Sequence, residues 1–137
     1  MRRVALAAAA ALALFASVTW WALESGGVAV VETRRPDGGT RATHVWFVEQ
    51  EGVLWLEAGA PGNGWFSDVQ RDPALRFSFA GVSARYRAVP VADPAHRTAL
   101  RDALRERYGL RDAWVGMFVD GERSMAVRLD PLADGLP

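Results

Sequence analysis

The sequence predicts a mainly β (α+β) fold, a small barrel of six strands with one main helix, preceded by a single transmembrane helix at the N-terminus. Three observations predict it. An uncharged run, Val4 to Leu23, opens the chain. Short alternating apolar segments follow between glycine- and proline-rich turns, a pattern typical of barrel strands. One longer segment, residues 94–108, carries apolar residues at helical spacing.

The uncharged run is long enough for one membrane crossing, because a helix rises about 1.5 Å per residue and the hydrocarbon core is about 30 Å thick. Arg2 and Arg3 precede the run, and Trp20-Trp21 stand where interfacial aromatic residues lie. A retained anchor and a cleaved signal peptide are the two alternatives, and Ser25-Gly26-Gly27 is a poor cleavage site.

We therefore expect residues 1–27 to form a membrane anchor or an uncleaved signal, and residues 28–137 to form the folded domain of a single-pass membrane protein. Basic residues flank the apolar run on both sides, since Arg34 and Arg35 follow it. The positive-inside rule therefore leaves the side of the membrane open.

The strands are predicted from β-branched or alternating apolar runs between turn residues. Glu51-Gly52 connects two runs as a tight hairpin, and Pro36-Asp37-Gly38-Gly39, Gly81 and Asp120-Gly121 mark further turns. The expected strands cover residues 28–33, 43–49, 53–57, 75–79, 84–91 and 124–129.

The main helix has a clear start, with Asp93 as N-cap and Pro94 at the first helical position. Gly109 is its expected C-terminal cap. A short helix is expected over residues 65–70 and a further helical turn over residues 112–118. The buried stripe of the main helix is predicted at Leu100, Ala103, Leu104 and Tyr108.

Composition excludes several functions. The 16 basic and 16 acidic residues balance to zero net charge, which argues against nucleic acid as a partner. With no cysteine there is no disulfide, thiolate metal site or cysteine nucleophile. His44 and His96 lack metal-ligand spacing, and Ser67-Asp68 lacks the context of a hydrolase nucleophile. We therefore predict no metal site and no catalytic side chain.

The glycine-rich segment 59–64 is the most informative motif. It follows the apolar run Val53-Leu54-Trp55-Leu56 and leads into the short predicted helix at Trp65. A glycine loop between a strand and a helix start can direct backbone N–H groups toward an anion. This pattern predicts a site for a phosphate-bearing cofactor.

The order of these elements resembles the split β-barrel (PNPOx-like) oxidoreductases that bind flavins or the deazaflavin coenzyme F-420. The match is closest to the deazaflavin-dependent nitroreductase and quinone-reductase group. It rests on the segments Gly38-Gly39-Thr40-Arg41-Ala42-Thr43-His44, Glu51-Gly52, Gly59-Ala60-Pro61-Gly62-Asn63-Gly64-Trp65-Phe66 and Arg71-Asp72-Pro73, and it spans about residues 28–131.

The resemblance implies a split β-barrel that binds a deazaflavin, or alternatively FMN, and transfers hydride to a quinone or nitro-type acceptor. It also implies a homodimer. The alternative is a non-catalytic module for a lipid-like or haem ligand. Carried over by position, the cofactor-binding residues would be Arg41, Thr43, His44, Val45, Gly59, Ala60, Asn63, Gly64 and Trp65, and the substrate pocket would include Tyr108 and Trp114.

Two of these residues have a structural alternative. Arg41 is also interpreted as a solvated charge at a strand end, and Trp65 as an anchor of the core, where aromatic side chains usually lie.

Overall fold

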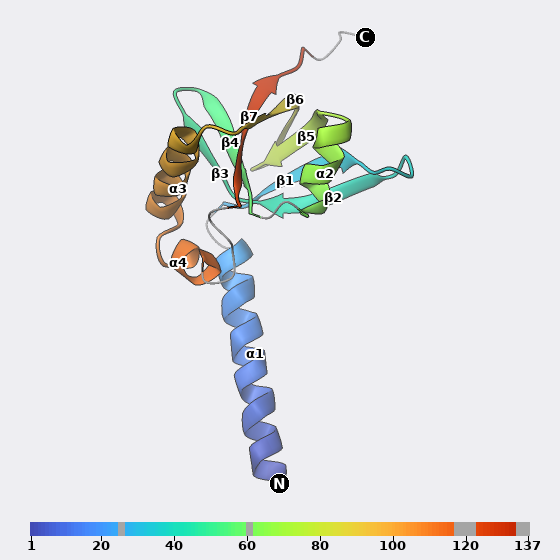
Figure 1. The fold of residues 1–137 in the computed structure, drawn as a ribbon. Helices are drawn as coiled ribbons and strands as arrows, with labels where there is room; N and C mark the ends of the chain where they lie inside the picture. The colour runs from blue at the N-terminus through green and yellow to red at the C-terminus, as the bar shows by residue number, and fades with distance from the viewer. Residues whose placement is uncertain (25–26, 60–61, 117–122, 134–137) are drawn as a thin grey trace.

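The computed structural model describes residues 1–24, 27–59, 62–116 and 123–133, and in these ranges the chain forms one sheet of seven strands and four helices (Figure 1). The strands are β1 (Ala29–Arg34), β2 (Thr40–Val45), β3 (Phe47–Gln50), β4 (Val53–Ala58), β5 (Ala74–Phe79), β6 (Val82–Val91) and β7 (Met125–Pro131). The helices are α1 (Arg2–Glu24), α2 (Gly64–Arg71), α3 (Pro94–Tyr108) and α4 (Leu110–Gly116).

The sheet curls into an open barrel because of its strand order, β2-β1-β5-β6-β7-β4-β3, in which each neighbouring pair is antiparallel. β2 and β3 form the two ends of this order, yet Trp46 alone separates them along the chain. The chain therefore leaves one ladder and joins the other within a single residue. The two ends of the sheet must lie close together, and this closes the barrel on one side.

The prediction of six strands is wrong, because the described residues form seven. The segment expected as one strand, 43–49, forms β2 and β3, and β2 begins earlier, at Thr40. The apolar run is continuous, but its first part pairs with β1 and its second part pairs with β4. The segment 43–49 is therefore divided by a change of hydrogen-bonding partner and not by a break in its apolar pattern.

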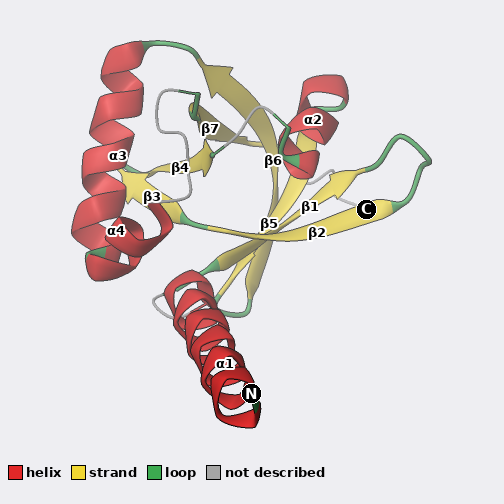
Figure 2. Ribbon diagram, turned by 60° about the horizontal axis from the view of Figure 1, so that its bottom comes forward, coloured by secondary structure: helices red, strands yellow, loops and turns green. Residues whose placement is uncertain are grey.

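The main core lies inside the curved sheet. Every strand contributes a buried side chain to it, and Trp65, Phe66 and Val69 of α2 belong to the same core. α2 lies against β1 and β2 (Figure 2). A second core lies on the other face of the sheet, under α3. It contains Val48, Leu100, Leu104, Tyr108 and Ala126.

The prediction of a transmembrane anchor at the N-terminus is wrong. The expected helix forms as α1, but none of the helices in the described ranges is long and apolar enough to cross a membrane. Its commonest residue is alanine, whose small side chain contributes little apolar area. Near its C-terminal end, the Phe15 ring lies 5.6 Å from the Trp114 ring of α4, and Thr19 accepts a hydrogen bond from Trp114 Nε1. The prediction of a single-pass membrane location depended on this anchor and is wrong for the same reason.

The main helix agrees with its sequence signals. Asp93 Oδ1 accepts a hydrogen bond from the Ala95 N–H, Pro94 begins the helix, and Gly109 ends it with φ 55°. The hairpin at Glu51-Gly52 also forms, with both residues at positive φ. Local chemistry dictates these features, and they form as predicted. The turn expected at Asp120-Gly121 lies outside the described residues.

Candidate functional site

α2 places an acidic side chain on its buried face. Trp65, Phe66 and Val69 enter the core from this helix, and Asp68 lies among them with 2% of its surface exposed. A carboxylate is rarely buried to this extent without partners. The contacts of Asp68 therefore determine whether its side chain is charged.

Three side chains contact the Asp68 carboxylate. Thr33 Oγ1 and Arg41 Nε both donate hydrogen bonds to Oδ2, over 2.9 and 2.8 Å. Thr33 and Arg41 can share this acceptor because they lie opposite each other in the β1–β2 register. On the other oxygen, Arg71 Nη2 lies 3.6 Å from Oδ1. Two guanidinium groups thus surround one buried carboxylate, an excess of one positive charge.

These contacts keep Asp68 ionised. Burial alone would raise the pKa of the Asp68 carboxyl, but the hydrogen bonds from Arg41 and Thr33 and the charges of Arg41 and Arg71 outweigh burial, and the pKa is lowered. Asp68 therefore acts as a fixed anion that holds the half-exposed Arg41 side chain against α2.

The Arg41 guanidinium lies directly over the first residue of α2. A methyl group placed on Gly64 would come within 2.7 Å of both Cζ and Nη1 of Arg41, so glycine is what permits this approach. Asn63 is the N-cap of the helix, and its side chain makes no capping hydrogen bond. Helix N-terminal N–H groups lack intrahelical partners, so a cation and unpaired amide donors meet at this position.

The residues predicted on β2 do not share one face. Arg41 and Thr43 are half-buried and alternate with exposed residues, and Val45 continues their face into the core. His44 is exposed on the opposite face of the strand. One surface can therefore be built from Arg41 and Thr43, but His44 does not belong to it.

The glycine-rich segment is described in part. Gly59 follows β4, Asn63 and Gly64 begin α2, and Ala60 lies outside the described residues. Trp65 is 3% exposed and packs in the main core. Its position agrees with the interpretation as a core anchor.

The two residues predicted for the substrate pocket have separate surroundings. The buried Tyr108 hydroxyl accepts a hydrogen bond from the Phe47 N–H and lies 3.2 Å from the carbonyl oxygens of Phe47 and Gly27. The Trp46 ring stacks on Tyr108 at 4.5 Å. Trp114, by contrast, contacts Phe15 and Thr19 of α1. Tyr108 is thus held by the backbone at the β2–β3 crossing.

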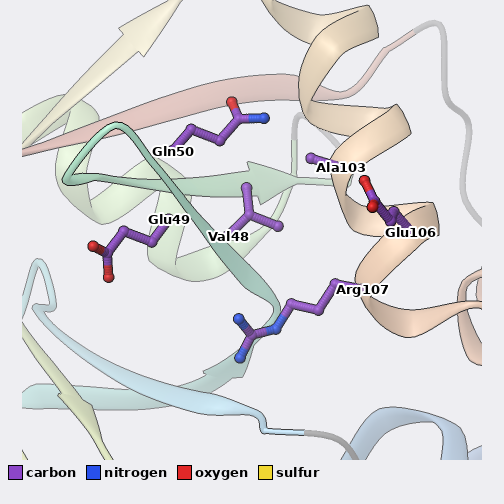
Figure 3. A pocket seen from close by; sticks show the side chains of 6 residues that line it. All are labelled: Val48, Glu49, Gln50, Ala103, Glu106 and Arg107. Atoms are coloured by element: carbon purple, nitrogen blue, oxygen red, sulfur yellow. The ribbon is translucent and has the colours of Figure 1, made fainter.

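A groove of about 340 Å³ lies between β3 and α3 (Figure 3). It is separate from Arg41, because its lining contains none of the residues predicted to bind the cofactor. The side chains that line it are Val48, Glu49, Gln50, Ala103, Glu106 and Arg107.

Sequence reasoning missed Thr33, Asp68 and Arg71. A signal for Asp68 was available, since it lies three residues after Trp65 and next to Val69, on the apolar side of the short helix. An acidic residue on an apolar helix face predicts a buried partner. Thr33 had no such signal, because its role depends on the register between β1 and β2.

Comparison with known proteins gives the fold. No family model matches the chain, and no curated protein matches it. A conserved hypothetical protein from Mycobacterium tuberculosis shares the fold with a TM-score of 0.62 and 22% identity, over 85% of this chain and 79% of that one.

Two further solved structures carry functional names. An F420 reductase has a TM-score of 0.55 and 18% identity, covering 83% of this chain and 93% of its own. A candidate pyridoxamine 5′-phosphate oxidase from Listeria innocua has a TM-score of 0.58 and 15% identity, covering 86% and 93%. The neighbours are split-barrel, PNPOx-like proteins, and this chain has their fold.

Proposed function

We propose that this protein binds the phosphate-bearing tail of a deazaflavin of the coenzyme F-420 type, or of FMN, where Arg41 meets the first turn of α2. With that cofactor bound it would act as an oxidoreductase on a flat quinone or nitro-type acceptor. The observation that carries the proposal is the Arg41 guanidinium held over Gly64, beside an N-cap that makes no side-chain hydrogen bond. The fold shared with an F420 reductase supports the same ligand class.

The residues at this position fit an anionic group. The N-terminus of a helix carries a partial positive charge and unpaired N–H donors. Arg41 uses Nε on Asp68, and its terminal nitrogens make no other hydrogen bond to the part of the chain described here. A guanidinium presents its donors in a planar fork that matches phosphate oxygens. Arg71 offsets the Asp68 charge, so Arg41 keeps its attraction for an anion.

The chain's own contribution would be to hold the cofactor and to orient it. A flavin or deazaflavin supplies hydride transfer when bound, and the protein supplies the pocket and its electrostatics. Asp68, which also accepts a hydrogen bond from Thr33, fixes the Arg41 side chain, and this lowers the conformational entropy that Arg41 loses on binding an anion. Thr43 lies on the same face of β2, two residues farther along, and extends the surface.

The test is a titration of the full-length chain with oxidised deazaflavin, FMN and riboflavin, followed by quenching of tryptophan fluorescence. Riboflavin is the matched control because it lacks the phosphate. The proposal predicts a Kd below about 100 μM, roughly −5.5 kcal/mol, for at least one phosphate-bearing ligand. Riboflavin should bind at least tenfold more weakly than FMN if FMN is the ligand.

Arg41→Gln supplies the second arm. It should weaken the phosphate-bearing ligand about tenfold, the loss expected for a charge-assisted hydrogen bond, and should leave riboflavin unchanged. Equal affinity for FMN and riboflavin would contradict the proposal that this position recognises the phosphate. Binding of haemin or a fatty acid without any flavin or deazaflavin would instead favour the non-catalytic module.

A further inference from the structure

The outer face of β5 and β6 carries three arginines in close array. Residues of these strands alternate between the barrel interior, which holds Leu75 and Phe77, and the outer face, which holds Arg76, Arg85 and Arg87. Arg76 lies directly opposite Arg85 in the β5–β6 register, and Arg87 is two residues farther along the same face. We call Arg76, Arg85 and Arg87 the arginine face.

This arrangement is unfavourable within the chain alone, because like charges directly opposite each other on a sheet repel. Arg76 Nε is 3.7 Å from Glu32 Oε2, a half-exposed pair of small value. Arg85 and Arg87 form no ion pair with any residue in the described ranges.

The neighbouring carboxylates do not balance the positive charge of the arginine face. Asp130 lies opposite Arg87 in the β6–β7 register, but its two oxygens accept hydrogen bonds from Arg128 over 2.7 and 3.0 Å. These contacts raise the pKa of the Arg128 guanidinium, chiefly through the hydrogen bond. Among the described residues of this face, Arg76, Arg85, Arg87 and Arg128 therefore meet the carboxylates of Glu32 and Asp130, four cations against two anions, on a chain whose net charge is zero.

Hydroxyl groups adjoin the arginines. Ser78 Oγ and Ser83 Oγ are 2.9 Å apart, and Arg76 Nη1 lies 3.5 Å from Ser83 Oγ. The helices pack elsewhere, since α3 lies against β3 and β7, and α2 lies against β1 and β2. The result is an exposed sheet surface of cations and hydroxyls on two adjacent strands.

We propose that the arginine face docks an acidic segment of a partner protein in extended conformation. An extended chain repeats its side chains on one face at about 6.6–6.8 Å, the spacing between Arg85 and Arg87 along β6. Alternate carboxylates of such a segment can therefore meet these two guanidinium groups together. Arg76 and Ser78 on β5, one strand away, would bind a second row of acceptors.

The probe is a fluorescein-labelled decapeptide of alternating Glu and Thr, titrated with the full-length chain and followed by fluorescence anisotropy. The Arg85→Gln/Arg87→Gln variant should bind at least tenfold more weakly than the natural chain. The matched control is Arg35→Gln/Arg105→Gln, which removes the same charge from exposed positions elsewhere and should bind as the natural chain does. Salt should weaken the natural interaction, because exposed charges are screened.

Three results would overturn the proposal. Equal loss in both double variants would show attraction by net charge alone. Tighter binding of a DNA duplex than of the peptide, lost in the same variant, would assign the face to nucleic acid. A change from dimer to monomer on Arg85→Gln/Arg87→Gln, measured by sedimentation velocity, would assign it to a second copy of this chain. Arg85→Lys/Arg87→Lys keeps the charge and guards against misfolding, and it should retain most of the binding.

Discussion

Arg41 on β2 donates a hydrogen bond from Nε to Oδ2 of Asp68 on α2, over 2.8 Å. The contact joins the end strand of the sheet to the helix that packs over the barrel interior. It also fixes the guanidinium over Gly64, at the start of that helix. A buried anion thus determines where the candidate ligand-binding cation lies.

The close approach of Arg41 to Gly64 gives the first prediction. Gly64→Ala places a methyl group 2.7 Å from Cζ of Arg41, so the guanidinium must move away. Stability should fall by less than about 2 kcal/mol, because Thr33 and Arg71 still contact Asp68 when Arg41 moves, and alanine is the better helix former. Affinity for the phosphate-bearing cofactor should fall about tenfold, as expected for loss of a charge-assisted contact. Thermal unfolding and the cofactor titration measure the two effects.

Gly62→Ala is the control for this variant. A methyl group on Gly62 meets no atom within 4 Å, so this change leaves Arg41 in place. It should therefore leave the affinity unaltered. If both alanine variants lose affinity equally, the loss comes from the loop backbone and the position of Arg41 is irrelevant.

The ionisation of Asp68 gives the second prediction. Because the pKa of Asp68 is lowered in the folded chain, its charge stabilises the fold above the unfolded pKa, about 3.9, and this contribution is lost as pH falls through the folded value. Asp68→Asn should lower the free energy of unfolding at pH 7 by about 2 kcal/mol, the loss expected for hydrogen bonds to a charged group.

The difference between Asp68→Asn and the natural chain should then shrink as pH falls below about 4. Urea unfolding at pH 7, 5 and 3 measures it. A difference that stays constant over this range would mean that packing of the side chain, and not its charge, stabilises the site.

Features set by local chemistry could be predicted from the sequence. α3 begins at its N-cap and proline and ends at its glycine, and the Glu51-Gly52 hairpin forms where two turn residues separate apolar runs. The division of 43–49 into β2 and β3 could not be predicted, because it depends on which distant strands supply hydrogen bonds. The apolar run at the N-terminus predicted a helix correctly and its membrane role wrongly.

The candidate site divides in the same way. Arg41 and the start of α2 lie together, as the family resemblance implied, but the Asp68 carboxylate that holds Arg41 is brought there by tertiary packing. Tyr108 has a contact that the sequence did not indicate. Resemblance implies a place in a substrate pocket, and the structure shows that its hydroxyl contacts the backbone of Phe47 and Gly27. Side-chain identity could not distinguish these roles without the sheet order that brings α3 against β3.

The Tyr108 hydroxyl gives the third prediction. Phe47 is at the end strand of the sheet, so its N–H and C=O lack a strand neighbour on that side, and Tyr108 is their partner. Tyr108→Phe keeps the ring against Trp46 but leaves these buried groups unpaired. The free energy of unfolding should fall by about 1–3 kcal/mol, with cofactor affinity unchanged. Denaturant unfolding and the cofactor titration measure the two. Lost affinity at full stability would instead support a role for Tyr108 in the ligand pocket. The matched control is Tyr86→Phe, a tyrosine packed at the margin of the other core.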